Sequence, residues 1–265
     1  MAPISELQPA EKIARDAGRY LMEKRAELMK SGGVVRETKG RNDFVTAADK
    51  GAELLIREGL AKAFPGEKFL GEETGGAAWN DGAVWIVDPL DGTTNFIHGL
   101  PLFSVSIGRL VNGQPDLGVI YDPSHDECFS GGPGLGATLN GTPIRCREAG
   151  SLKTAFLATG FPFRQIDRFE EYLLLFAAAT RASEGMRRCG SAAIDLAWTA
   201  AGRFHGFFEL GLSPWDIAAG WAIIEGAGGK VSDLYDDAPP LPNGHILATC
   251  ASIHEELHAL FRASR

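Results

Sequence analysis

Two aspartates lie three positions apart, directly after an apolar run that predicts a buried strand. The run covers residues 83–87, so the strand would deliver Asp88 at its C-terminal end. An intervening Pro-Leu pair gives Asp88 and Asp91 the residue order of a β-turn, which places their Cα atoms within about 7 Å. Both carboxylates then converge with the backbone carbonyl of Leu90. Such hard oxygen ligands suit Mg²⁺, which takes a few carboxylates and completes its shell with water and phosphate.

Further acids stand where predicted elements begin or end. They are Asp49 and Asp216, each at a helix start, and Glu72 and Glu73, at the end of a strand. Taken alone, the DPLDG segment also fits an acidic surface turn. If the acids converge, however, like charges about 4 Å apart repel by roughly 4 kcal/mol at an effective dielectric near 20, so the cluster requires bound cations. Free N–H groups at Gly92 and Thr93 would then hold a phosphate oxygen.

The composition is that of a soluble globular protein. Of 265 residues, 45% are hydrophobic and 23% are charged, and the net charge is −8, so nucleic acid is not expected as the main ligand. The apolar runs are too short to cross a bilayer and the N-terminal residues do not resemble a signal peptide, so we expect a cytoplasmic protein. Cysteines without a CxxC pair predict buried free thiols: Cys128, Cys146, Cys189 and Cys250.

The predicted secondary structure that must position these acids changes along the chain. Apolar residues at helical spacing predict helices over residues 13–28 and 49–64. From residue 103 the pattern is one of strands, with hairpin turns at Asn112-Gly113 and Asn140-Gly141. Strands then alternate with helices, which argues for an α/β half after an α+β half. We therefore expect halves at residues 1–145 and 146–265, joined in one compact body.

Five motifs, in this order, resemble those of the inositol monophosphatase family, within a superfamily of lithium-sensitive, metal-dependent phosphatases. They are NDFVTAAD (42–49), GEE (71–73), WIVDPLDGTTNF (85–96), GSAA (190–193) and PWDIAAG (214–220). The resemblance implies a layered α-β-α-β-α sandwich of the inositol monophosphatase and fructose-1,6-bisphosphatase type. It also implies a homodimer, inhibition by lithium, and two or three Mg²⁺ ions per site.

The same resemblance assigns roles position by position. Glu72, Asp88 and the Leu90 carbonyl would bind one ion, while Asp88 would bridge to a second ion that is also held by Asp91 and Asp216. Asp49 and Thr93 would orient or deprotonate the attacking water, and Glu72 would assist by holding a weaker third ion. Phosphate and substrate contacts would come from Asp91, Gly92, Thr93, Ser191, Ala192, Glu209 and Asp216.

The implied activity is that of a phosphoric monoester hydrolase acting on a small polyol phosphate, most directly myo-inositol monophosphate. Metal-activated water would release phosphate without a phosphoenzyme. Fructose 1,6-bisphosphate, histidinol phosphate and other sugar or nucleotide phosphates are alternative substrates. A regulatory, protein-binding role on a phosphatase scaffold is the alternative outside catalysis.

Three further patterns are interpreted as structural. His254 and His258 match the HExxH zinc pattern, but none of the seven residues that follow is a plausible third ligand, so we expect an exposed helix end. The glycine-rich segment 132–136 lies between predicted strands, where a hairpin turn is expected instead of a dinucleotide loop. Arg187 and Arg188 are expected to be ion-paired parts of the scaffold.

Overall fold

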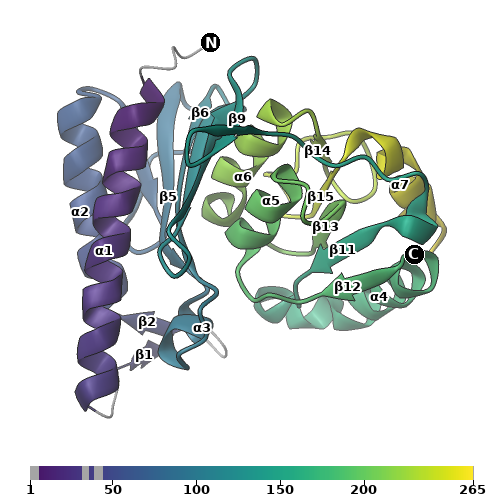
Figure 1. Ribbon diagram of the computed structural model, residues 1–265, viewed down its shortest axis with the longest axis horizontal. Coiled ribbons are helices and arrows are strands. Elements are labelled where there is room, and N and C mark those ends of the chain that lie inside the picture. The colour runs from purple at the N-terminus through teal and green to yellow at the C-terminus, as the bar shows by residue number, and fades with distance from the viewer. Residues whose placement is uncertain (1–5, 32–35, 39–43, 265) are drawn as a thin grey trace.

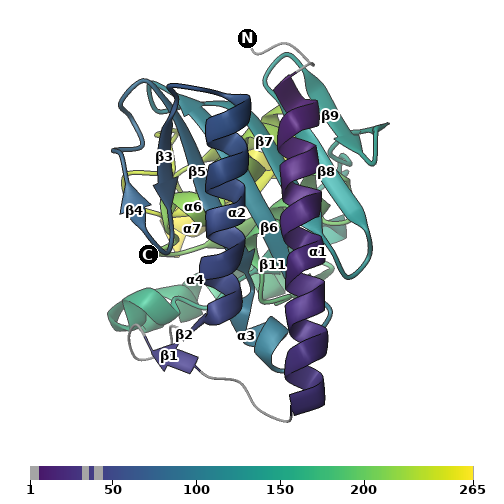
Figure 2. The same ribbon diagram turned by 90° about the vertical axis from the view of Figure 1, so that its left-hand side faces the viewer.

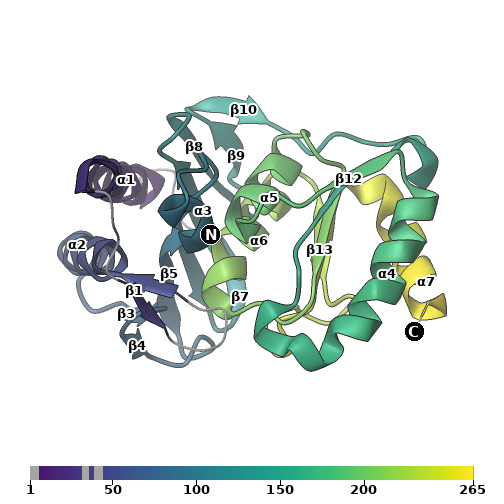
Figure 3. The same ribbon diagram turned by 90° about the horizontal axis from the view of Figure 1, so that it is seen from below.

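Five layers of secondary structure, in the order α-β-α-β-α, build the protein (Figures 1 and 3). The computed structural model describes residues 6–31, 36–38 and 44–264. One outer layer holds helices α1 (Leu7–Ser31) and α2 (Ala47–Ala63), and the other holds α4 (Phe169–Ala182) and α7 (His254–Ala263). Helices α5 (Ala192–Ala200) and α6 (Pro214–Gly226) lie between the two sheets. The layered fold that the motifs implied is therefore confirmed.

The first sheet has eight strands in the order β10-β9-β8-β7-β6-β5-β3-β4. Neighbouring strands are antiparallel except β3 and β5, which are parallel. The strands are β3 (Lys68–Gly71), β4 (Gly75–Gly76), β5 (Ala83–Asp91), β6 (Ser104–Val111), β7 (Gln114–Asp122), β8 (Glu127–Gly132), β9 (Gly136–Leu139) and β10 (Thr142–Ile144). Helices α1 and α2 cover its outer face (Figure 2), because residues such as Ala14, Ala17 and Leu21 form one fully buried helical face.

The predicted hairpin turns are confirmed. Asn112 and Gly113, between β6 and β7, have φ values of 52° and 76°, as a type I′ turn requires. Asn140 and Gly141 repeat this conformation between β9 and β10, with φ values of 49° and 77°. A further antiparallel pair, β1 (Arg36–Thr38) and β2 (Phe44–Thr46), precedes α2. The first two residues of the NDFVTAAD motif lie outside the described residues.

The second sheet has the order β12-β11-β13-β15-β14. Strand β11 is parallel to β12 and β13, whereas β15 is antiparallel to both of its neighbours. The strands are β11 (Phe156–Thr159), β12 (Gly185–Arg187), β13 (Gly206–Glu209), β14 (Lys230–Ser232) and β15 (Ile246–Thr249). The first sheet thus ends at residue 144 and the second begins at residue 156.

Helix α6 belongs to the C-terminal half of the chain but packs directly on the first sheet. Gly108 of β6 and Gly118 of β7 are opposite each other in the antiparallel ladder and face its backbone. A Cβ on Gly118 would lie 2.2 Å from the carbonyl oxygen of Ala219, and one on Gly108 would lie 2.6 Å from the Ala219 nitrogen. Two glycines therefore allow the close approach that sets the position of the α6 N-terminus, where Asp216 lies.

We expect Gly118→Ala to destabilise the protein. The added methyl group meets backbone that cannot move like a side chain, and overpacking of this kind costs about 1–3 kcal/mol. Equilibrium unfolding in urea measures the loss. Gly150→Ala is the matched control, because a Cβ at Gly150 has no neighbour within 4 Å. Equal stability of the two variants would contradict the close-packing argument.

The exposed helix end expected for the HExxH pattern is wrong. His254 is 2% exposed and His258 is fully buried, because α7 packs its histidine face inward. Ser232 Oγ lies 3.1 Å from Nε2 of His254 and 2.9 Å from Nε2 of His258. The Thr249 hydroxyl lies 2.8 Å from His254 Nδ1, and the Asp233 carbonyl accepts from His258 Nε2 at 2.9 Å. The two imidazoles thus belong to a buried hydrogen-bond network between α7 and the second sheet.

The remaining expectations for cysteines and loops agree with the structure. All four cysteines are free thiols, with Cys189 half-buried and the others buried. The glycine-rich segment connects β8 to β9 as a hairpin loop, as predicted. Among the described residues, no helix combines the length and the apolar character needed to span a membrane.

Candidate active site

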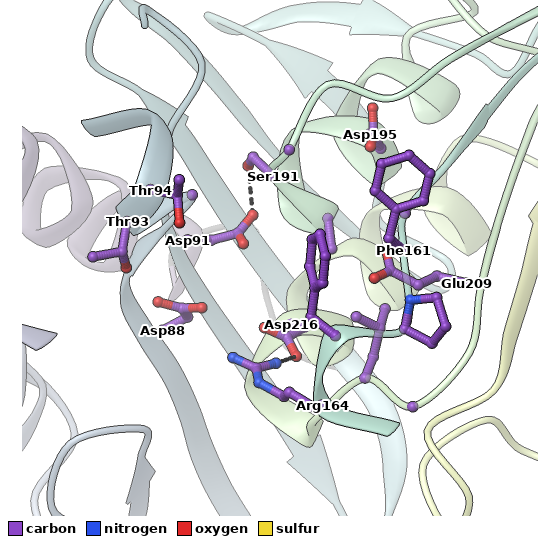
Figure 4. A pocket seen from close by; sticks show the side chains of 18 of the residues that line it. Asp88, Asp91, Thr93, Thr94, Phe161, Arg164, Ser191, Asp195, Glu209 and Asp216 are labelled. Carbon is purple, nitrogen blue, oxygen red and sulfur yellow. Dashed lines mark hydrogen bonds and ion pairs between the residues drawn. The ribbon is translucent and has the colours of Figure 1, made fainter. Parts of the chain in front are cut away.

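Three carboxylates from two distant parts of the chain meet at one end of the first sheet (Figure 4). Asp88 and Asp91 lie at the end of β5, and Asp216 lies in the first turn of α6. Each offers an oxygen, and these oxygens lie within 4.8 Å of one another. The exposed fractions of the three residues are 1%, 8% and 2%. Convergence of acids that are far apart in sequence is the geometry that a cation site requires.

The backbone at the end of β5 is irregular around the two aspartates. The register against β6 shifts between Asp88 and Asp91, so the strand runs past the predicted turn but bulges there. The Leu90 N–H donates to Asp88 Oδ1 at 2.9 Å, and the Thr93 hydroxyl donates to the Leu90 carbonyl at 3.0 Å. Gly92 has a φ of 90°, and a Cβ there would lie 2.9 Å from a backbone carbonyl oxygen, so glycine suits this position.

The N-termini of two helices between the sheets hold the other two aspartates. Asp91 Oδ2 accepts from the Ser191 hydroxyl at 2.5 Å and from the Ala193 N–H at 2.7 Å, where α5 begins. Ser191 also caps α5, because its Oγ accepts from the Ile194 N–H. Asp216 belongs to the capping box of α6, and its Oδ2 accepts from the backbone N–H of Ser213 at 2.7 Å.

Glu72 borders the same cluster, whereas Asp49 does not line the adjoining cavity. Glu72 follows β3, and its N–H donates to the Val87 carbonyl of β5 at 3.1 Å. The next N–H, of Glu73, donates to the buried carboxylate of Glu53 at 2.8 Å, which fixes this turn. Asp49 lies in the first turn of α2 and is 3% exposed; it is not among the residues that line the adjoining cavity.

Burial and mutual repulsion dominate the electrostatics of the cluster. Burial raises the pKa of Asp88 well above its usual range, and the charges of Glu72, Asp91 and Asp216 raise it further. Burial and then the charge of Asp216 raise the pKa of Asp91 to about 6, against the opposing effect of its bonds to Ser191 and Ala193. An all-oxygen donor set whose charges repel one another fits a hard divalent cation such as Mg²⁺.

A cavity of about 510 Å³ extends from the acids to the second sheet. Glu209 at the end of β13 lines it and is 9% exposed, so its carboxylate is not a freely solvated strand end. Burial raises the pKa of Glu209 well above its usual range, while the charge of Arg188 opposes this shift. A Cβ on Gly160 would lie 1.9 Å from a Glu209 carboxylate oxygen, so a larger residue at position 160 would require this carboxylate to shift. The predicted residues Gly92, Thr93, Ser191 and Ala192 also line the cavity.

Sequence reasoning missed several residues of the cavity. Arg188 lines it and lies over the rings of Phe161 and Phe163, at 5.1 and 5.5 Å from their centroids, so it belongs to the cavity wall; its expected ion pairing in the scaffold stays a prediction. Arg164 reaches Asp216 and Glu72 from the loop that follows β11. Asp195 of α5 also lines the cavity and is 1% exposed. The GSAA motif gave a signal for its neighbours Arg188 and Asp195, but no motif marks Arg164.

Comparison with known proteins gives concordant results over nearly the full chain. The profile of the inositol monophosphatase family matches residues 5–265. The chain is 45% identical over 215 residues to Nus factor SuhB of Pseudomonas aeruginosa, covering 79% of each protein. It is 42% identical over 265 residues to inositol-1-monophosphatase of Synechocystis, covering 98% of this chain and 91% of that protein. The structure of an inositol monophosphatase from Anabaena is similar with a TM-score of 0.86 at 41% identity, covering 98% and 96% of the two chains.

Proposed function

This chain belongs to the inositol monophosphatase family, and from that premise we propose that it hydrolyses a small polyol phosphate monoester, with myo-inositol monophosphate as the first candidate. The observation that carries the proposal is the convergence of Asp88, Asp91 and Asp216 at one end of a cavity that Glu209 lines from β13. A cation site for phosphate and a buried carboxylate for a hydroxyl group are what a polyol phosphate needs.

The acids are proposed to hold Mg²⁺ in the arrangement that the family implies. One donor set would be Glu72, Asp88 and the Leu90 carbonyl, which line the cavity. The other would be Asp88, Asp91 and Asp216, whose oxygens lie within 4.8 Å of one another. When bound, Mg²⁺ supplies a lowered pKa for water and neutralises charge on the phosphate and the leaving oxygen.

The remaining residues are proposed to position water and phosphate. The Thr93 hydroxyl, 3.0 Å from the Leu90 carbonyl, would orient the water that attacks phosphorus. The role of base that the resemblance implies for Asp49 stays a prediction, because Asp49 does not line the cavity. The N–H groups of Gly92 and Thr93 would hold phosphate oxygens. The water oxygen would form the new bond to phosphorus while the bond from phosphorus to the polyol oxygen breaks, and the leaving polyol oxygen takes up a proton. The products are phosphate and the free polyol, so no side-chain nucleophile is needed.

Polyol recognition is assigned to the α5 start and to β13. Ser191 and Ala192 line the cavity next to Asp91, and Glu209 lines it from the second sheet. A hydroxyl hydrogen-bonded to a carboxylate gives strong discrimination, because a substrate that lacks the hydroxyl leaves a buried polar group unpaired. The exact phosphate ester, the homodimer and lithium inhibition stay predictions.

A phosphate-release screen tests the proposed function. The panel contains inositol 1-phosphate, fructose 1,6-bisphosphate, histidinol phosphate, glycerol phosphates and nucleotide monophosphates, each with Mg²⁺ and with excess EDTA. We expect release with Mg²⁺, loss of release with EDTA, and the highest kcat/KM for inositol 1-phosphate. Release that is equal in Mg²⁺ and EDTA, or absent for every ester, would contradict the proposal.

A second candidate function is regulatory protein binding. It is favoured by one observation, the 45% identity to a protein named Nus factor SuhB. The Asp88→Asn variant separates the two functions, because it should lose hydrolysis while its outer surface is unchanged. Wild type and variant are each used to capture proteins from an extract of the cells in which the protein occurs. A partner that both capture would support binding that is independent of catalysis. No partner with either protein would leave the phosphatase as the function.

A further inference from the structure

A positively charged side chain reaches into the acidic cluster. Arg164 belongs to the 3-10 segment Phe163–Arg168 that follows β11, and its guanidinium donates to Asp216 Oδ2 at 2.6 Å. Its other terminal nitrogen lies 3.4 Å from Glu72 Oε1. Figure 4 shows this side chain extending from the loop toward Asp216. The same guanidinium therefore contacts one acid from each of the two proposed donor sets.

The loop is built in a way that aims this side chain at the acids. The backbone at Gln165 departs from helical values, with φ −130° and ψ 59°. Gln165 packs against Gly211, where a Cβ would lie 2.7 Å from the amide carbon of Gln165. Gly211 is two residues from Glu209 and has a φ of 76°. The Gln165 side chain thus packs on this glycine, next to the residue that carries the guanidinium.

The contact changes the charge balance at the cluster. The charge of Arg164 opposes the rise in pKa of both Asp88 and Asp91, so it acts on the cluster in the same direction as a bound cation. The Arg164 side chain is 39% exposed, whereas that of Asp216 is 3% exposed. A long, partly solvated side chain can leave for water, but Asp216 is held by the capping box of α6. Arg164 is thus the movable partner of the pair.

We propose that Arg164 is a built-in counter-cation that competes with Mg²⁺ for Asp216 and Glu72 and so sets the affinity of the metal site. This inference rests on the proposed metal-dependent function. Mg²⁺ must displace the guanidinium from two carboxylates, and the displaced side chain remains at the cavity wall. Arg164 is a positioning residue for the acids. Removal of its side chain raises the affinity for Mg²⁺ and lowers the stability of the metal-free protein.

Calorimetric titration with Mg²⁺ tests the competition directly. We expect Arg164→Gln to bind Mg²⁺ about 3- to 10-fold more tightly than wild type, an effect between those of an exposed ion pair and a charged hydrogen bond to a buried group. Arg164→Lys keeps the charge without the forked geometry and should fall between the two. Arg203→Gln is the matched control, because it removes an arginine pair with Glu127 outside the cavity and should leave the affinity unchanged.

Thermal unfolding gives a second measurement that does not depend on turnover. Without metal, Arg164→Gln should unfold at a lower temperature than wild type, because the acids repel one another with less compensation. In saturating Mg²⁺ the gap should close, since bound Mg²⁺ then neutralises the acids in both proteins. Equal Mg²⁺ affinity in wild type and Arg164→Gln would overturn this inference and leave the proposed function intact. If wild type binds no Mg²⁺, the proposed function fails with it.

Discussion

Asp88→Asn should lower kcat by a factor on the order of 10² to 10³, the effect of removing one strong electrostatic group from an active site. Asp88 is the acid proposed to serve both metal ions, and it is 1% exposed at the end of β5. Asparagine keeps the shape and the acceptor for the Leu90 N–H but lacks the charge. Initial rates of phosphate release at saturating substrate and Mg²⁺ measure the loss.

The same substitution has a second expected result that a misfolded variant would not give. Without metal, Asp88→Asn should be at least as stable as wild type, because it removes a buried charge that Glu72, Asp91 and Asp216 repel. Stabilisation by Mg²⁺ should shrink. Asp122→Asn is the matched control: this aspartate is also fully buried, but it bonds to Ser124 and His125 at the end of β7, so turnover should persist. Near-normal kcat in Asp88→Asn would show that the metal assignment is mistaken.

Local signals in the sequence were sufficient for most of the fold. Asn-Gly turns specify their own backbone conformation, and buried helix faces repeat at helical spacing, so both could be predicted from neighbouring residues. Strand β14, with three residues, and strand β4, with two, are too short to show a period, so the sequence pattern does not indicate them. The buried face of α7 was mispredicted for another reason: only the tertiary structure brings Ser232 and Thr249 next to its histidines.

The residues of the candidate site also divide into those that the sequence indicates and those that it does not. Asp88, Asp91 and Asp216 stand in motifs at the ends of elements, so their types and positions in the sequence alone indicate a cation site. Arg164 could not be found by this route. Its contact with Asp216 joins residues 52 positions apart and depends on how one loop packs against Gly211. Motifs thus mark groups that chemistry requires, whereas groups that act through tertiary packing leave no local pattern.

Glu209→Gln should separate stability from activity. Burial raises the folded-state pKa of Glu209 above the value near 4.5 of the unfolded chain, so folding disfavours its charged form. The stability that Glu209 contributes is therefore full below about pH 4.5 and is lost as pH rises through the folded-state pKa. Glutamine is neutral throughout. At pH 8 in EDTA, the variant should gain on the order of 1 kcal/mol, or about 2–4 °C in Tm for a chain of this size, and the gain should disappear toward pH 4.5.

Activity should fall in the same variant, and only for substrates that carry a hydroxyl group for Glu209 to bind. A hydrogen bond to a charged group contributes roughly 1.5–3 kcal/mol, so kcat/KM for inositol 1-phosphate should fall about 10- to 100-fold in Glu209→Gln. Hydrolysis of p-nitrophenyl phosphate, which has no such hydroxyl, should change by less than about threefold. Glu225→Gln is the control, since burial also raises the pKa of Glu225 but this residue lies on α6 outside the cavity. Equal losses on both substrates would assign Glu209 to the scaffold, because recognition of a hydroxyl cannot affect an ester that lacks one.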